Sequence, residues 1–104
     1  MSKRSAYRQF PNVSKFLDEK LVLRRKALKL TQTELAERAG VTRNCIQQLE
    51  CHEHLPLPST MFRLIHALRF NEEETAAFWV GINAAYMKDR ELQEKTSQTK
   101  QEVI

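Results

Sequence analysis

The sequence contains few of the residues that form tight turns or covalent cross-links: its 104 residues include two Gly, three Pro and two Cys. An all-β chain needs many tight turns and a phosphate-binding loop needs several glycines, so neither is expected. No apolar stretch approaches the roughly 18 to 20 residues that cross a bilayer, and no signal-peptide core follows the basic N-terminus. We therefore expect a mainly helical, soluble and cytoplasmic protein with reduced cysteines and no membrane contact.

Positive charge is concentrated at the N-terminal end of the chain. Residues 1–30 contain nine Lys and Arg but only two acidic residues, whereas residues 71–104 contain four basic and seven acidic residues. A chain of this length can build one core and buries about 60% to 70% of its unfolded surface, so self-association is an open question. The charge asymmetry favours an anionic partner, of which nucleic acid is the commonest, over a merely solvated helix face.

Residues 1–13 are predicted to form a basic arm, because Pro11 interrupts any helix there. Ser14 is the expected N-cap of a first helix. The apolar stripe of this helix is predicted from spacings of four and eleven residues, at Leu17, Leu21 and Leu28. Arg25 lies on the same stripe, so its guanidinium needs a carboxylate partner if it is buried.

Two short helices with a turn between them are predicted next. Thr31 and Glu34 have the spacing of a capping box, which starts the second helix. Gly40 is placed to end it, since glycine adopts the left-handed conformation without a Cβ penalty. Thr42 is the expected cap of a third helix over residues 43–50, with Ile46 and Leu49 pointing inward.

A proline-containing loop is predicted to separate the third helix from a fourth, for which Ser59 is the expected cap. Asn71 and Glu74 repeat the capping-box spacing and begin a fifth helix. The predicted organisation is an arm (residues 1–13), a helical domain (residues 14–75), a C-terminal helix (residues 76–95) and a polar tail (residues 96–104).

The fifth helix is apolar on every side over residues 76–87, so it must be covered by two surfaces. One stripe is bulky and one is narrow; they consist of Phe78, Ile82 and Tyr86, and of Ala77, Gly81 and Ala85. We expect one stripe to cover the core and the other to form a homodimer contact. The alternative is that the whole segment packs within the monomer.

Residues 32–50, QTELAERAGVTRNCIQQLE, closely resemble the helix-turn-helix of the lambda-repressor-like family of DNA-binding regulators, the Cro/CI or XRE type. The shared pattern is Gln32 opening the first helix, Ala36 at the helix crossing, Gly40 in the turn and Glu50 ending the second helix. The resemblance covers about residues 14–75. It implies an all-α, five-helix DNA-binding domain, here with an extended hydrophobic fifth helix.

Four side chains are predicted to face outward on the third helix when its apolar residues point inward: Arg43, Asn44, Gln47 and Gln48. Amides pair with adenine and guanidinium groups with guanine in the major groove. Arg43, Asn44 and Gln48 are the main expected base contacts. For Gln47, nearer the helix flank, a phosphate contact or a supporting role is equally plausible.

Phosphate contacts are expected from two sources. The family resemblance implies backbone contacts from Gln32 and Thr42, for which the alternative is helix capping alone. The arm offers Lys3, Arg4 and Arg8, which either follow the DNA backbone or a minor groove or make no contact. The basic residues that often follow the motif in this family are missing, and His52 and His54 are possible substitutes.

The resemblance also implies a structural ion pair between Arg25 and Glu50. Glu50 would then be the carboxylate partner that Arg25 needs on the apolar stripe of the first helix. A metal site is not expected, because the cysteines and histidines at positions 45, 51, 52 and 54 match no standard zinc spacing. A catalytic site is not expected either, since a Cys–His pair needs a cleft and an orienting group. No cofactor is predicted.

The sequence therefore predicts a nucleoid-associated transcriptional regulator that binds double-stranded DNA. We expect a repressor that reads a palindromic site as a homodimer. The alternative is an antitoxin or other interaction module of the same fold, which binds a partner protein through residues 76–87.

Overall fold

The computed structural model describes the backbone of residues 9–103 and the side chains of residues 9–94, and this part of the chain contains helices and no strand. The helices, in order, are α2 (Pro11–Leu17), the π-helical η2 (Asp18–Val22), α3 (Leu23–Ala27), α4 (Gln32–Ala39), α5 (Arg43–Glu50), α6 (Pro58–Ala67) and α7 (Glu72–Val103). Because α2, η2 and α3 follow one another without interruption, they form one helical segment. The predicted all-α architecture of five helices is confirmed.

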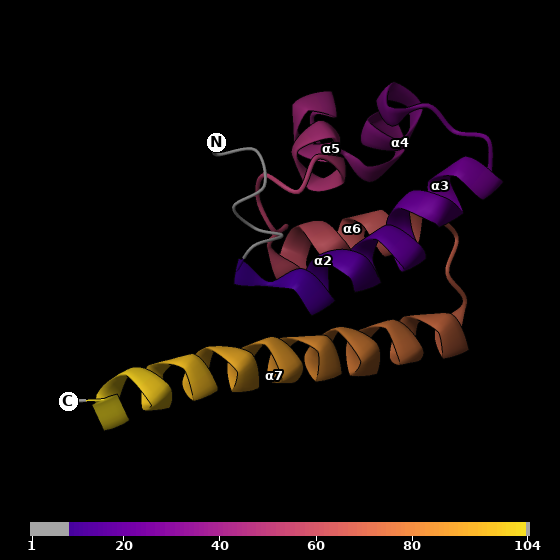
Figure 1. The fold of residues 1–104 in the computed structure, drawn as a ribbon. Helices are drawn as coiled ribbons and strands as arrows, with labels where there is room; N and C mark the ends of the chain where they lie inside the picture. The colour runs from indigo at the N-terminus through magenta and orange to yellow at the C-terminus, as the bar shows by residue number, and fades with distance from the viewer. Residues whose placement is uncertain (1–8, 104) are drawn as a thin grey trace.

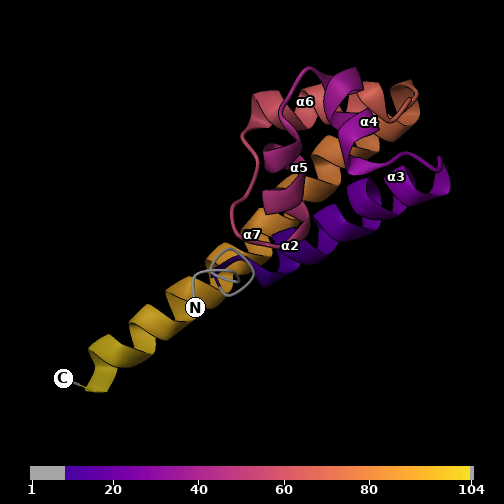
Figure 2. The same cartoon turned by 90° about the horizontal axis from the view of Figure 1, so that it is seen from above.

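The helices lie in three layers (Figure 1). α4 and α5 form one outer layer, α7 forms the opposite one, and the α2–α3 segment lies between them with α6. Viewed from above, the C-terminal part of α7 extends beyond the other helices (Figure 2). A single core joins the layers through buried side chains that include Leu17, Leu35, Ile46, Leu64 and Phe78.

The first helix begins earlier than its sequence predicts. Pro11 occupies its first turn, and Phe10 is the N-cap residue. Proline is well tolerated there because the first helical N–H groups have no partner within the helix. Ser14, the predicted cap, is instead a buried residue inside α2. Leu28 lies beyond the end of α3 and is 37% exposed, so its predicted place on the apolar stripe is wrong.

The N-terminus of α2 is capped by a side chain from the other end of the chain. Asp89 on α7 is 1% exposed. Its Oδ2 accepts the backbone N–H of Val13 at 2.9 Å, and its Oδ1 accepts the backbone N–H and the side-chain amide of Asn12 at 3.1 and 2.8 Å. A carboxylate at a helix N-terminus satisfies unpaired N–H groups and complements the helix dipole. Asp89 therefore attaches α7 to the start of the first helix.

Substitution of Asp89 by alanine is expected to lower the free energy of unfolding by about 2 kcal/mol, because buried N–H groups of α2 lose their acceptor. Chemical denaturation of the full chain measures this effect. Asp89→Asn keeps one carbonyl acceptor, so its free energy of unfolding should lie between those of Asp89→Ala and the parent chain. Glu91→Ala, which removes an exposed carboxylate from the same turn of α7, is the control and should change stability little. Equal stability of Asp89→Ala and the parent chain would contradict the capping role.

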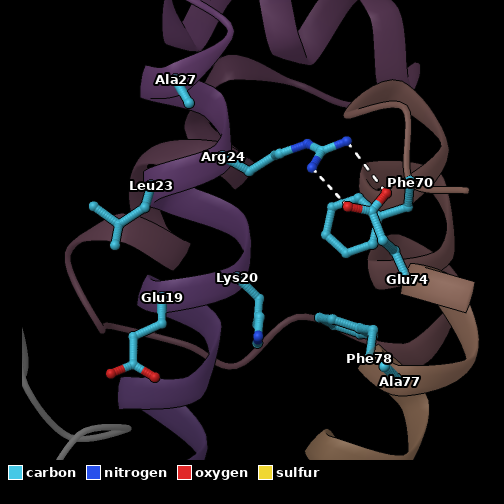
Figure 3. Close-up of a pocket in the computed structure, with 9 residues that line it drawn as sticks. All are labelled: Glu19, Lys20, Leu23, Arg24, Ala27, Phe70, Glu74, Ala77 and Phe78. Atoms are coloured by element: carbon cyan, nitrogen blue, oxygen red, sulfur yellow. Dashed lines mark hydrogen bonds and ion pairs between the residues drawn. The ribbon is translucent and has the colours of Figure 1, made fainter.

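Arg24 attaches the other end of α7 (Figure 3). Its Nη1 donates to Glu74 Oε2 at 3.0 Å, its Nε donates to the backbone carbonyl of Leu68 at 3.0 Å, and its guanidinium lies over the ring of Phe70. Glu74 also completes the predicted capping box, accepting the backbone N–H of Asn71 at 2.9 Å. One arginine thus joins the first helix, the end of α6 and the start of α7.

These contacts make the attachment of α7 dependent on pH. The backbone N–H of Asn71 and then the guanidinium of Arg24 lower the pKa of Glu74 below its ordinary value. A carboxylate with a lowered pKa in the folded state stabilises the fold fully above its unfolded pKa, and this contribution is lost as the pH falls through the folded pKa. Glu74→Gln should therefore flatten the dependence of unfolding free energy on pH between about pH 5 and pH 3.

Urea denaturation at a series of pH values tests this prediction. Glu73→Gln, which neutralises an exposed neighbouring carboxylate, is the matched control and should keep the slope of the parent chain. Identical slopes for Glu74→Gln and the parent chain would show that Glu74 does not contribute to acid sensitivity.

Both predicted stripes of α7 pack largely within the chain, as expected for the stripe that covers the core but not for the one expected to form a homodimer contact. Phe78, Ile82 and Ala85 are buried in the core. Gly81 lies against the ring of Phe16 on α2, where a Cβ would overlap the ring. Tyr86 packs edge-on against the Phe10 ring, with 5.8 Å between centroids. Of the six residues, Ala77 alone is exposed.

α7 also continues through the predicted polar tail, with helical backbone as far as Val103. Despite its length, α7 does not combine the apolar composition and the extent that a membrane crossing requires, and neither does any other helix in the described part of the chain.

Candidate nucleic-acid interface

α4 and α5 are joined by a turn whose geometry follows from its residues. Thr31 and Glu34 form both hydrogen bonds of the capping box at the start of α4. Gly40 ends α4 in the left-handed conformation with φ of 72°, and the backbone N–H of Val41 donates to the carbonyl of Ala36 at 3.0 Å. These are the predicted elements of the motif, and they fix the crossing of α5 over α4.

α5 presents one face to the core and the other to solvent. Ile46 is fully buried and Leu49 is 6% exposed, which fixes the rotation of the helix about its axis. Arg43, Asn44 and Gln47 are exposed, whereas Gln48 is half-buried. The solvent-facing side therefore carries the residue types that read base edges. Gln47 is thus more exposed than Gln48, although helical periodicity places Gln47 nearer the helix flank.

Thr42 and Gln32 lie at the N-termini of α5 and α4. The hydroxyl of Thr42 accepts the backbone N–H of Cys45 at 3.1 Å, so it caps α5 and keeps its own O–H for another acceptor. The side-chain amide of Gln32 donates to Glu50 Oε1 at 2.9 Å. Gln32 is thus tied to the end of α5, with one amide hydrogen left for a second contact.

The predicted arm contacts Lys3, Arg4 and Arg8 lie outside the described residues. One cation at the motif is not predicted by the sequence: the guanidinium of Arg63 on α6 lies beside Gly40 at the turn between α4 and α5. No local signal in the sequence relates Arg63 to the motif, because the contact joins residues that are far apart along the chain.

Arg25 and Glu50 hold α5 against the first helix. Nε and Nη2 of Arg25 donate to Oε2 and Oε1 of Glu50 at 2.7 and 3.0 Å, and both side chains are 12% exposed. The Nη1 of Arg25 donates to the carbonyl of Leu30 at 2.7 Å. With Gln32, this network joins the first helix, the start of α4 and the end of α5, so the exposed face of α5 is held on a fixed support.

The segment after α5 is also fixed. His52 has φ of 61°, and the backbone N–H of Glu53 donates to the carbonyl of Gln48 at 3.0 Å, as in a Schellman helix end. The imidazole Nε2 of His52 lies 2.7 Å from Asp18 Oδ2 on the first helix. His52 is therefore already bonded within the chain, whereas His54 is exposed.

The cysteines do not build a site. Both thiols are free, Cys45 half-buried and Cys51 exposed. Among the described residues, no group of three or more His, Cys, Asp or Glu side chains is arranged to hold a metal ion. Cys51 is the C-cap residue of α5 and lies seven residues after Asn44, so it is on the same side of the helix as Asn44.

The fold and the exposed side of α5 define a helix-turn-helix protein. A family model described as helix-turn-helix matches residues 21–74. The chain belongs to this family, of the XRE and lambda-repressor-like type. Neither a curated protein nor a solved structure gives a significant match. Family membership indicates a DNA-binding transcription regulator.

Proposed function

We propose that the protein recognises a specific DNA sequence by placing α5 in the major groove. One observation carries this proposal: Arg43, Asn44 and Gln47 are exposed on a helix whose opposite face is buried. Arg pairs bidentately with guanine, and Asn and Gln with adenine, and each good pair discriminates by about 1–3 kcal/mol. Gln48 is the fourth base-contacting residue, in a supporting role because it is half-buried.

Thr42 and Gln32 are proposed to position α5 by contacting phosphates, together with the unpaired backbone N–H groups that begin α4 and α5. Arg63 adds a positive charge beside the turn. Phosphate contacts of this kind set the register of the helix on DNA, while base contacts supply the sequence specificity.

We propose repression rather than activation, because a protein that occupies the major groove excludes other proteins from the same DNA. The sequence also predicts a homodimer on a palindromic site, which requires two α5 helices on one side of the dimer, roughly 34–36 Å apart. α7 lies on the opposite side of the domain from α5 (Figure 1). A dimer contact through α7 would therefore lie away from the surface that is proposed to bind DNA.

Selection of bound duplexes from random DNA with the full chain tests the proposed function, followed by interference footprinting at guanine N7. We expect enrichment of one short motif and interference in the major groove. Absence of enrichment over random DNA would overturn the proposal. The symmetry of the selected motif tests only the arrangement of the dimer, since a single site and a palindrome both require sequence reading.

A further inference from the structure

The first helix and α7 touch at two places and are separated between them. Phe16 lies against Gly81. About two turns further along the first helix, Arg24 Nη1 donates to Glu74 Oε2 at 3.0 Å. Lys20 is four residues from Phe16 and four from Arg24, so it lies on the same side of the first helix, toward α7. The question is therefore what faces Lys20 on α7.

A cleft of about 380 Å³ lies between the first helix and α7 at this level (Figure 3). The residue numbers of the two contacts run in opposite directions, so Lys20 is level with Ala77 and Phe78 of α7. The side chain of Ala77 is too short to fill the space between the helices. Clefts that bind small molecules have volumes of about 300–1,000 Å³, so this cleft is large enough for a small ligand.

Lys20 supplies a positive charge that the cleft itself does not neutralise. Figure 3 shows its side chain extending toward Phe78, and its Nζ lies 5.9 Å from the centre of the Phe16 ring. Among the residues that the structure describes, no carboxylate forms an ion pair with Lys20. At the end of the cleft, by contrast, Arg24 and Glu74 neutralise each other.

Glu19 is the other charged residue that lines the cleft. Its carboxylate points away from α7 (Figure 3). Glu19 also lines the next hollow along the two helices, where Lys15 and Lys88 provide positive charges. The charge that faces α7 inside the cleft is therefore the ammonium of Lys20.

We propose that the cleft binds a small carboxylate anion with an apolar body. The carboxylate pairs with Lys20 Nζ, and the apolar body lies between the two helices. The cleft is mainly apolar there, with walls that consist of Leu23, Ala27, Phe70, Ala77 and Phe78. Leu23 is 57% exposed, so a ligand removes apolar surface from water.

The charge of the cleft selects this class of ligand over others. A neutral apolar ligand would cover the ammonium of Lys20 without pairing it, which is unfavourable. A cation would be repelled by Lys20. A dianion would bring a second negative charge to a cleft in which the remaining cation, Arg24, already donates to Glu74 and to the backbone carbonyls of Leu68 and Arg69.

The position of the cleft separates it from the surface that is proposed to bind DNA. The cleft lies between the first helix and α7, whereas α4 and α5 lie on the other side of the first helix (Figure 1). A ligand in the cleft therefore does not compete directly with DNA on α5. The inference goes beyond the proposed function, and its test is made without DNA.

The probe is 3-phenylpropionate, and 3-phenylpropanamide is its uncharged match. Each compound is titrated into the ¹⁵N-labelled full chain, and the backbone amide chemical shifts measure affinity and locate the ligand. We expect saturable shifts around the cleft with a dissociation constant of about 1 mM or below for the carboxylate. The amide should bind about fivefold more weakly because it does not pair with Lys20.

Three variants test the residues of the cleft. Lys20→Gln should weaken binding of the carboxylate about fivefold and leave binding of the amide unchanged. Lys15→Gln removes an exposed lysine from the same helix outside the cleft, so it is the matched control and should keep the affinity of the parent chain. Ala77→Leu fills the cleft and should abolish binding of both compounds. Ala77 is exposed, so this variant should keep the circular dichroism spectrum of the parent chain.

Each alternative result would overturn a stated part of the proposal. Absence of saturable shifts with the parent chain would remove the site. Equal affinity for the carboxylate and the amide would overturn the anionic ligand, and equal losses in Lys20→Gln and Lys15→Gln would overturn the pairing with Lys20. Undiminished binding by Ala77→Leu would place the ligand outside the cleft.

Discussion

Replacement of both Arg43 and Asn44 by alanine is expected to lower affinity for the selected DNA motif by about 100-fold or more. Each side chain is proposed to pair with one base edge, and two pairs at the lower part of the 1–3 kcal/mol range give this factor. Both residues are exposed on α5 and neither contributes to the buried side that holds the helix. The loss should therefore appear in binding and leave thermal unfolding nearly unchanged. Fluorescence anisotropy with the selected duplex measures it.

Two comparisons separate base reading from general attraction to DNA. The affinity of the double variant for a random duplex should fall only as much as the loss of one positive charge explains. The slope of log affinity against log salt concentration should decrease by the release of about one counterion. Arg69→Ala removes an exposed positive charge from the turn between α6 and α7, so it serves as the charge control and should keep the sequence preference. Equal losses on selected and random duplexes would contradict base reading by Arg43 and Asn44.

The motif was predictable because its signals are local. Thr31 and Glu34 define the start of α4 over three residues, Gly40 is the residue that a left-handed helix end favours, and Thr42 caps the next helix. The inward direction of Ile46 follows from helical periodicity alone. Each inference needs only residues within one or two turns, so the structure reproduces the predicted bounds of α4 and α5.

Contacts between distant residues account for most of what was missed. The acceptor that caps α2 is Asp89, 76 residues away from Val13, and no pattern near Pro11 points to it. For this reason the local signals favour Ser14 as the start of the helix. Helix ends at Lys29, His52 and Arg69 have positive φ without glycine, so the usual signal for a left-handed helix end is absent there.

The two sides of α7 could not be assigned from the sequence, because residues 76–87 are apolar on every side. Assignment depends on where the first helix meets α7. Phe16 contacts Gly81, and Asp89 reaches the start of α2, so this side is internal and Val80 is external. The same limitation applies to Gln47 and Gln48, whose different exposure depends on packing around α5 that helical periodicity does not describe.

Removal of the carboxylate at position 50 is expected to have the largest effect on stability. In the parent chain the side chain of Arg25 is 12% exposed. Glu50→Ala leaves its guanidinium without an ion-pair partner and leaves the side-chain amide of Gln32 without its acceptor. Loss of one partner of a buried ion pair costs about 3–5 kcal/mol. For a domain of this size, the melting temperature should fall by more than about 10 °C. Thermal unfolding followed by circular dichroism measures this change.

The pair also predicts how the loss should respond to further substitution. Glu50→Gln retains an oxygen acceptor without the charge, so it should lose less stability than Glu50→Ala. If Arg25→Met is added to Glu50→Ala, the buried unpaired charge disappears and part of the lost stability should return. Glu37→Ala, which removes an exposed carboxylate from α4, should leave the melting temperature nearly unchanged. A fall of only a few degrees for Glu50→Ala would mean that α5 is held mainly by Ile46 and Leu49 and not by this ion pair.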